Sequence, residues 1–335
     1  MSAALVSLDA VSKRFALRLS LGDRIAARLG AGVENRAVRA VEAVSLEIAR
    51  GETLGLVGES GCGKSTLGRI AVGILAPDAG EALIDGQRVM EGGPRPVKRT
   101  TRIQTVFQDP FASLDPRMKI GDIVAEGPIA HGFVTPAAAP AYVAEWLARV
   151  GLEPDHAARY PHQFSGGQRQ RVAIARALAM RPDVLVCDEP VASLDVSIQA
   201  QIVNLFLDLK RELGLTMLFI SHDLGVVRHL SERIAIMYLG RVVELGSTAE
   251  VLARPHHPYT KALLDSVPKL VRAGSGRAAF KPIAGEIPSP LDPPAGCHFH
   301  PRCPHAFARC RAERPNLAII GAGRHSACLR EEHAT

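Results

Sequence analysis

Gly58-Glu-Ser-Gly-Cys-Gly-Lys-Ser-Thr66 fits the pattern G-x-x-x-x-G-K-[ST], and this stretch decides the fold. The apolar run Thr53–Val57 before it predicts a buried strand, and a helix is expected to begin at Lys64. Glycines in such a turn let backbone N–H groups approach phosphate oxygens, and the helix N-terminus favours the negative charge. Lys64 is placed to reach the β- and γ-phosphates, and the Ser65 hydroxyl to bind Mg²⁺. The stretch, here called the phosphate loop, therefore predicts a nucleotide site.

The segments on either side of the phosphate loop alternate between strand and helix patterns. An amphipathic helix is expected at Ser197–Leu213, where apolar residues repeat at helical spacing, and a hairpin over 234–244. The other expected elements are strands at Ile103–Phe107, Val184–Cys187 and Thr216–Ile220, and helices at Val143–Val150 and Gly167–Met180. Such alternation predicts an α/β fold with a mainly parallel sheet and helices on both faces.

Two carboxylates follow the apolar strand in Val184-Leu-Val-Cys-Asp-Glu189. Asp188, at the carboxyl end of the strand, is the natural partner of Mg²⁺. Glu189, one residue further, can orient or deprotonate an attacking water molecule. No Asn/Thr-Lys-x-Asp tetrapeptide of the kind that reads guanine occurs in the chain, which favours ATP over GTP.

A second site for an anion is predicted at Phe164-Ser-Gly-Gly-Gln-Arg-Gln-Arg171, where small residues stand just before a helix. With this stretch the sequence resembles the ABC-type ATPases, whose signature motif has this form. Three further motifs are similar to those of the family: Val106-Phe-Gln-Asp-Pro110 to its Q-loop, Ser193-Leu-Asp195 to its D-loop, and Ser221-His-Asp223 to its switch histidine.

The resemblance implies a role for each matched residue. Catalysis is assigned to Lys64, Glu189 and His222. Mg²⁺ is assigned to Ser65, Gln108 and Asp188. The signature contacts with the ATP of a partner subunit are assigned to Ser165, Gly166, Gly167 and Gln168, and the D-loop contact to Asp195. The expected contacts with the chain's own ATP are Gly58, Glu59, Ser60, Gly61, Cys62, Gly63, Lys64, Ser65, Thr66 and Gln108, with Phe15 stacking on adenine.

The family's architecture has further consequences. In it, the signature of one ATPase domain closes over the ATP held by the phosphate loop of another, so that two ATP molecules lie between two domains. This chain has one such domain and must pair with a second copy or a paralogue. The resemblance also implies an antiparallel β subdomain, a helical subdomain at about 109–180, and a small C-terminal Cys-rich accessory domain.

A closer resemblance runs nearly the length of the chain. Gln108-Asp-Pro-Phe-Ala-Ser-Leu-Asp-Pro-Arg117, His257-Pro-Tyr-Thr-Lys-Ala-Leu-Leu264 and the stretch from Gly285 to Cys297 are similar to ATPase subunits of bacterial dipeptide/oligopeptide importers, specifically the second of the two. It implies an ATPase domain at 1–252 and an importer-type domain at 253–335. The implied partners are a second, paralogous ATPase subunit, two transmembrane permease subunits and an extracytoplasmic substrate-binding protein. The implied place is the cytoplasmic face of the plasma membrane.

Four of the six cysteines gather near the C-terminus: Cys297, Cys303, Cys310 and Cys328. A cytosolic chain should not form disulfides, so clustered thiols suggest a metal. Their spacing lacks the close pairs of most zinc sites and is compatible with either zinc or iron–sulfur. The resemblance to the importer ATPases favours a [4Fe–4S] cluster, with Zn²⁺ as the alternative.

Composition excludes several classes of protein. Apolar residues make up 47% of the 335 and charged residues 22%, which is ordinary for a globular protein, and no run is apolar enough for a transmembrane helix. No signal peptide is evident at the start. Aromatic residues are 4% of the chain and do not interleave with the basic ones, so nucleic acid is not expected as a partner.

Some alternatives stay open at this stage. The arginines of the insertion over 18–39 suit either a solvated surface or anionic lipid head groups. The cargo could be a dipeptide, a longer peptide, a nickel chelate or glutathione. A non-transport ABC ATPase acting on ribosomes or DNA is a competing function, although the chain lacks a second ATPase domain. A purely regulatory ATP-binding module is disfavoured because Glu189 and His222 are both present.

Overall fold

The computed structural model describes residues 4–16, 37–93, 96–267 and 283–330. At their centre is an eight-stranded sheet, whose strands in spatial order are β13 (Ala318–Gly321), β14 (Arg324–Ser326), β12 (Arg241–Ser247), β11 (Arg233–Tyr238), β3 (Thr53–Val57), β10 (Thr216–Ser221), β9 (Val184–Asp188) and β8 (Ile103–Val106). The strands from β11 to β8 run parallel, and the other three add antiparallel partners at one edge. The expected α/β fold with a mainly parallel core is confirmed.

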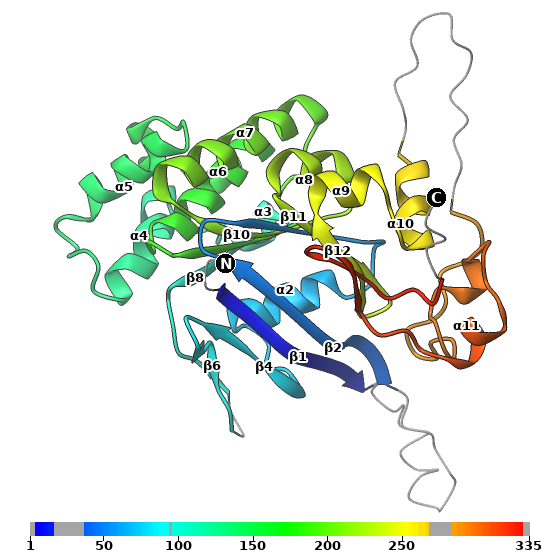
Figure 1. Cartoon of the computed structure of the whole chain (residues 1–335). Helices are drawn as coiled ribbons and strands as arrows, with labels where there is room; N and C mark the ends of the chain where they lie inside the picture. The colour runs from blue at the N-terminus through cyan, green and yellow to red at the C-terminus, as the bar shows by residue number, and fades with distance from the viewer. Residues whose placement is uncertain (1–3, 17–36, 94–95, 268–282, 331–335) are drawn as a thin grey trace, which may run out of the picture.

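A second sheet is antiparallel and consists of β2 (Ala37–Ala49), β1 (Ala4–Ala16), β4 (Ala79–Ile84) and β5 (Gln87–Arg88), beside a short ribbon of β6 (Met90–Glu91) and β7 (Val97–Lys98). Along β2, buried Val44, Leu46 and Ile48 alternate with exposed residues, as expected for a strand with one face in the core. Helix α2 (Lys64–Val72) lies between the two sheets (Figure 1). This is the antiparallel β subdomain that the family resemblance predicts.

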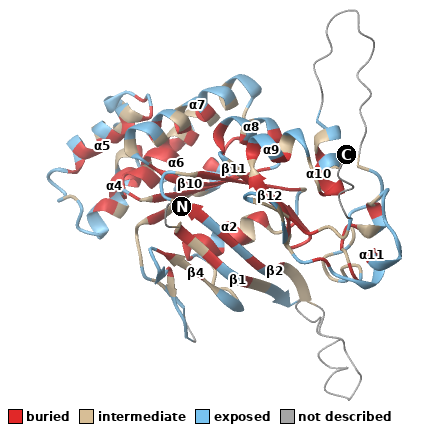
Figure 2. Ribbon diagram, in the orientation of Figure 1, coloured by how far each residue is buried: buried red, intermediate tan, exposed pale blue. Residues whose placement is uncertain are grey.

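Helices cover the other face of the main sheet. A group of mutually packed helical segments consists of α3 (Pro110–Ser113), α4 (Ile120–Ala130), α5 (Ala139–Arg149), η1 (Pro154–Ala158), η2 (Pro161–Gln163) and α6 (Gly166–Leu178). The remaining helical segments are α7 (Val196–Leu213), α8 (Leu224–Leu230), α9 (Thr248–Ala253), α10 (Pro258–Asp265), η3 (His300–Arg302) and α11 (Ala308–Ala312). The apolar stripe of α7 buries Ile202, Phe206 and Leu209. Buried residues lie on both faces of the main sheet (Figure 2).

The C-terminal segment is joined to the main sheet. β14 pairs with β12, and Ala327 donates a backbone hydrogen bond to the Val243 carbonyl at 2.8 Å. A separate Cys-rich accessory domain is therefore not confirmed, because part of this segment completes the edge of the ATPase sheet. The boundary between 252 and 253 stays a prediction.

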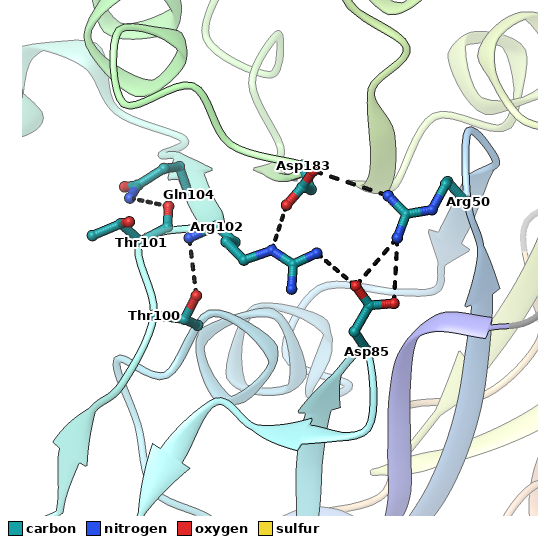
Figure 3. Close-up of polar contacts among 7 residues, drawn as sticks. All are labelled: Arg50, Asp85, Thr100, Thr101, Arg102, Gln104 and Asp183. Atoms are coloured by element: carbon teal, nitrogen blue, oxygen red, sulfur yellow. Dashed lines mark hydrogen bonds and ion pairs between the residues drawn. The ribbon is translucent and has the colours of Figure 1, made fainter. Parts of the chain in front are cut away.

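A network of charges ties the loops at the amino ends of the parallel strands (Figure 3). Arg102, just before β8, donates to Asp183, just before β9, at 2.5 Å and to Asp85, in the β4–β5 turn, at 2.7 Å. Arg50 reaches the same Asp85 at 3.2 Å. These residues link the antiparallel sheet to the main sheet and are here called the amino-edge network.

Within the described ranges, every helix is too short or too polar to cross a membrane. Of the arginines in the insertion, Arg18, Arg24, Arg28 and Arg36 lie outside the described residues.

Candidate nucleotide-binding site

The phosphate loop leaves the carboxyl end of β3, a fully buried strand with parallel partners on both sides. Its glycines are needed for space as well as for conformation. A Cβ on Gly58 would lie 2.1 Å from the Met237 carbonyl oxygen, and one on Gly63 would lie 2.0 Å from the Ala40 carbonyl oxygen. Gly63 also has φ of +108°, a region that residues with a side chain rarely adopt. The packing of two neighbouring segments therefore fixes the path of the loop.

The Lys64 ammonium is held inside this loop. Its Nζ donates to the carbonyl oxygens of Gly58 at 2.8 Å and Glu59 at 3.1 Å, and it lies 3.7 Å from Oε1 of Glu189. Only 3% of the side chain is exposed. A buried cation of this kind is placed to compensate negative charge that arrives at the loop.

Ser65 and Asp188 join the first turn of α2 to the end of β9. The Ser65 hydroxyl donates to Oδ1 of Asp188 at 2.7 Å. Burial raises the pKa of the Asp188 carboxyl, and the hydrogen bond from Ser65 opposes that shift. Hydroxyl and carboxylate oxygens are the ligands that Mg²⁺ prefers, so this adjacent pair fits the predicted magnesium site.

Glu189 lies between Lys64 and His222. Its Oε2 is 3.0 Å from Nδ1 of His222, and its backbone N–H donates to the Ile220 carbonyl at 3.0 Å. Glu189 has φ of +47°, a left-handed conformation that is uncommon for a residue with a side chain. The His222 side chain is 56% exposed, whereas the Glu189 side chain is only 13% exposed. The carboxylate is thus held near a cation while one side stays open toward the histidine.

The signature residues form the start of α6. Ser165 caps the helix by accepting from the Gln168 backbone N–H at 3.3 Å, and Gln168 Oε1 accepts from the Ser165 N–H at 3.0 Å. A Cβ on Gly167 would lie 2.6 Å from Cγ2 of Ile198, so this helix start packs closely on α7, which Asp195 precedes as N-cap residue. Among the described residues, no hydrogen bond or ion pair joins 165–168 to the phosphate loop.

The other predicted residues are less closely tied to this centre. Gln108 is exposed after the end of β8, and the next residue, Asp109, caps α3. The Phe15 side chain is 41% exposed at the end of β1, with Nζ of Lys13 5.9 Å from its ring centroid. At the tip of the phosphate loop, Ser60 and Gly61 are exposed. The structure therefore brings Lys64, Ser65, Asp188, Glu189 and His222 together, and the roles of these residues, like those of Gln108 and Phe15, stay predictions.

Two C-terminal residues that the sequence did not single out touch the phosphate loop. The Tyr259 hydroxyl accepts the backbone N–H of Glu59 at 2.9 Å. Arg302 donates to both carboxylate oxygens of Glu59, at 2.7 Å and 2.9 Å. They stand 200 and 243 residues along the chain from Glu59, so no local pattern could have signalled these contacts.

Burial raises the pKa of three of the four C-terminal cysteines, Cys297, Cys303 and Cys328. Burial raises the pKa of Cys297 to about 11, and the charges of Cys310, Cys328 and Cys303 raise it as well. Among the residues that the structure describes, however, no group of three or more His, Cys, Asp or Glu side chains is arranged to hold a metal ion. The predicted [4Fe–4S] cluster, and zinc as its alternative, are therefore not supported by this geometry.

Comparison with known proteins agrees with this arrangement. Residues 41–192 match the family model for ABC transporters, and residues 243–310 match the model for the C-terminal region of oligopeptide/dipeptide transporters. The chain is 49% identical to the oligopeptide transport ATP-binding protein AppF of Bacillus subtilis, over 87% of this chain and 89% of that protein. It is 48% identical to a Brucella ovis protein named as a peptide import ATP-binding protein, over 88% and 92%.

A solved structure supports the fold. CbiO1 from Clostridium perfringens, part of the ABC transporter complex CbiONQ, is similar with a TM-score of 0.59 and 28% identity, covering 75% of this chain and 91% of that one. The chain therefore belongs to the family of ABC transporter ATP-binding proteins, in the branch with the oligopeptide/dipeptide transporter C-terminal region.

Proposed function

We propose that this chain binds and hydrolyses ATP as the motor subunit that powers import of di- or oligopeptides through a membrane permease. The observation that carries the proposal is the convergence of Lys64, Ser65, Asp188, Glu189 and His222 from three separate stretches of sequence. The family match over 243–310 and the names of the relatives support peptides as the cargo.

The chain's own residues divide the work of hydrolysis. The phosphate loop and Lys64 bind the phosphates and compensate their charge. Glu189 orients the attacking water and accepts its proton, and His222 holds the free side of that carboxylate and contacts the γ-phosphate. Ser65, Asp188 and Gln108 would hold Mg²⁺, which when bound neutralises charge on the phosphate oxygens.

The second half of the site comes from another molecule. Ser165, Gly166, Gly167 and Gln168 present a helix N-terminus that makes no polar contact with the phosphate loop of its own chain among the described residues. This supports a dimer in which each signature, together with Asp195, closes over the ATP of the other subunit. The partners proposed are a paralogous ATPase subunit, two permease subunits and a substrate-binding protein, with the chain bound peripherally at the cytoplasmic face of the membrane.

The test is to trap the closed dimer. Glu189→Gln removes the proton acceptor but keeps the shape of the side chain, so ATP should stay bound between two subunits. We expect gel filtration in Mg-ATP, with the chain alone and with the second ATPase subunit, to show a two-subunit species that retains ATP. Glu153→Gln, an exposed position, is the control and should behave as wild type. A monomeric, ATP-free Glu189→Gln protein in both mixtures would contradict the proposal.

The cargo needs its own experiment. The intact complex, with permeases and binding protein, is reconstituted and its ATP turnover measured with each ligand. Peptides should stimulate turnover, whereas a nickel chelate or glutathione should not. Stimulation by one of the latter alone would reassign the cargo and leave the motor function standing. ATP turnover stimulated by ribosomes or DNA instead would favour the non-transport alternative.

The [4Fe–4S] cluster stays a prediction. What supports it is the resemblance of this cysteine pattern to the importer ATPases, together with the Cys297 N–H, which donates to the Cys310 carbonyl at 2.9 Å. Protein purified without oxygen should be brown, and Cys303→Ser should abolish the visible absorbance. Colourless protein with stoichiometric zinc would favour the alternative metal, and metal-free protein would exclude both.

A further inference from the structure

Two residues of the C-terminal segment, Tyr259 and Arg302, contact the phosphate loop at its second residue, Glu59. Arg302 meets the Glu59 carboxylate with two hydrogen bonds, and its own side chain is 3% exposed. A two-pronged pair of this kind fixes the orientation of both groups as well as their distance. Tyr259 holds the backbone of the same residue through the Glu59 N–H at 2.9 Å. Glu59 is thus restrained at the side chain and at the main chain by residues far away in the sequence.

Arg302 is itself held in place by its surroundings. Its guanidinium lies 5.9 Å from the ring centroids of both Tyr238 and Phe299, and its Nε donates to the Ala284 carbonyl at 3.2 Å. The ring centroids of Tyr238 and Tyr259 are 4.6 Å apart, and Phe299 packs edge-on against Tyr238. An arginine fixed on several sides loses little entropy when it makes this contact, so the contact can impose a position on Glu59.

The restraint extends from Glu59 to the catalytic lysine, because the Glu59 carbonyl is one of the two acceptors of Lys64 Nζ. The positive charge of Arg302 is a second reason to expect an effect on ATP binding. An unpaired carboxylate at this place in the loop would repel incoming phosphates, and Arg302 neutralises it.

We propose that Arg302 is a positioning residue that holds the phosphate loop in its ATP-binding form through Glu59, so that the C-terminal segment sets the affinity for ATP. This inference rests on the proposed ATPase function. It assigns no contact between Arg302 and ATP.

The test separates affinity from turnover. In the full chain, Arg302→Met should raise the KM for Mg-ATP and the Kd for a fluorescent ATP analogue about tenfold, with kcat within about twofold of wild type. Arg302→Lys should fall in between, because an ammonium keeps the charge but loses the two-pronged geometry. Arg309→Met is the matched control, since Arg309 makes a similar two-bond pair with Glu313 on the exposed α11 and should leave KM unchanged.

A double variant distinguishes positioning from simple charge neutralisation. In Glu59→Gln/Arg302→Met no carboxylate is left unpaired but the two hydrogen bonds are still missing, so affinity should stay at least threefold below wild type. Wild-type KM in Arg302→Met, or wild-type affinity in the double variant, would overturn the proposal. If Arg302→Met does not fold, the comparison of Arg302→Lys with wild type decides in the same way. Failure of the wild-type protein to bind ATP would count against the proposed function instead.

Discussion

The two edges of the parallel sheet, at the amino ends and at the carboxyl ends of its strands, differ in how their charges are paired. At the amino ends, Arg102 lies between Asp85 and Asp183, and every charge of this network faces an opposite charge across partly exposed loops (Figure 3). At the carboxyl ends, buried Lys64 donates to two carbonyl oxygens and approaches Glu189 only to 3.7 Å. At the amino edge, each charge of the network is paired with an opposite charge of the protein. At the carboxyl edge, the strongest partner for Lys64 would be an incoming anion.

The difference shows where charge serves the fold and where it serves chemistry. Ion pairs near the surface contribute little to stability because water and salt screen them. Buried charges are costly unless they are fully compensated, and a protein keeps them where they act on a ligand. Changes at the carboxyl edge should therefore affect ATP, while matched changes at the amino edge should affect stability slightly or not at all.

The largest contrast is expected between two glycines with positive φ. Gly63→Ala would force a Cβ to within 2.0 Å of the Ala40 carbonyl, so we expect ATP hydrolysis to be lost and the free energy of unfolding to fall by about 2 kcal/mol or more. Gly86→Ala, at φ of +73° in the amino-edge turn, meets no atom within 4 Å and should cost only about 1 kcal/mol of backbone strain. Thermal unfolding and turnover would check both; equal losses of turnover would contradict the comparison.

Two hydroxyl groups give a smaller contrast. Ser65→Ala removes the donor to Asp188 and one expected Mg²⁺ ligand, so the Mg²⁺ concentration that half-saturates hydrolysis should rise about 10- to 100-fold. Thr100→Ala removes the hydroxyl that accepts the backbone N–H of Arg102 at 3.1 Å, beside the amino-edge network. Magnesium titrations of turnover should leave this second variant at the wild-type value. A Ser65→Ala protein with unchanged magnesium dependence would exclude Ser65 as a ligand.

The smallest effect concerns pH. The hydrogen bond from Arg102 lowers the pKa of Asp85 below its ordinary value of 3.8, and desolvation opposes it. A lowered pKa stabilises the fold above the unfolded-state pKa, and this contribution is lost as pH falls through the folded-state pKa. Asp85→Asn should therefore lower Tm by less than about 2 °C at pH 7, and the difference should shrink as pH falls below 3.8. A Tm difference between wild type and Asp85→Asn that grows as the pH falls would contradict this prediction.

Local patterns were sufficient for much of the fold and site. The strand–loop–helix around 53–72 was predicted because its glycines, lysine and apolar strand are contiguous, and β3 and α2 begin as expected. Asp188 and Glu189 were predicted because a buried parallel strand delivers its last residues to the same edge as the phosphate loop. The left-handed backbone of Glu189 could not be foreseen, since nothing in its sequence requires it.

Long-range contacts lay beyond what patterns in the sequence can reveal. Arg302 and Tyr259 meet Glu59 only because the C-terminal segment folds back over the ATPase sheet. β13 and β14 are short and partly exposed, so their apolar pattern is too weak to predict that they extend that sheet. The match between signature and phosphate loop across two subunits remains a prediction that rests on the family.

The most direct test compares one carboxylate from each edge of the sheet. Steady-state ATP turnover is measured side by side for Glu189→Gln and Asp183→Asn, both amide replacements at positions flanking β9. The account predicts that kcat falls about 10³-fold in Glu189→Gln and stays within about twofold of wild type in Asp183→Asn. Equal turnover in the two variants, or a larger loss in Asp183→Asn, would contradict the assignment of chemistry to the carboxyl edge.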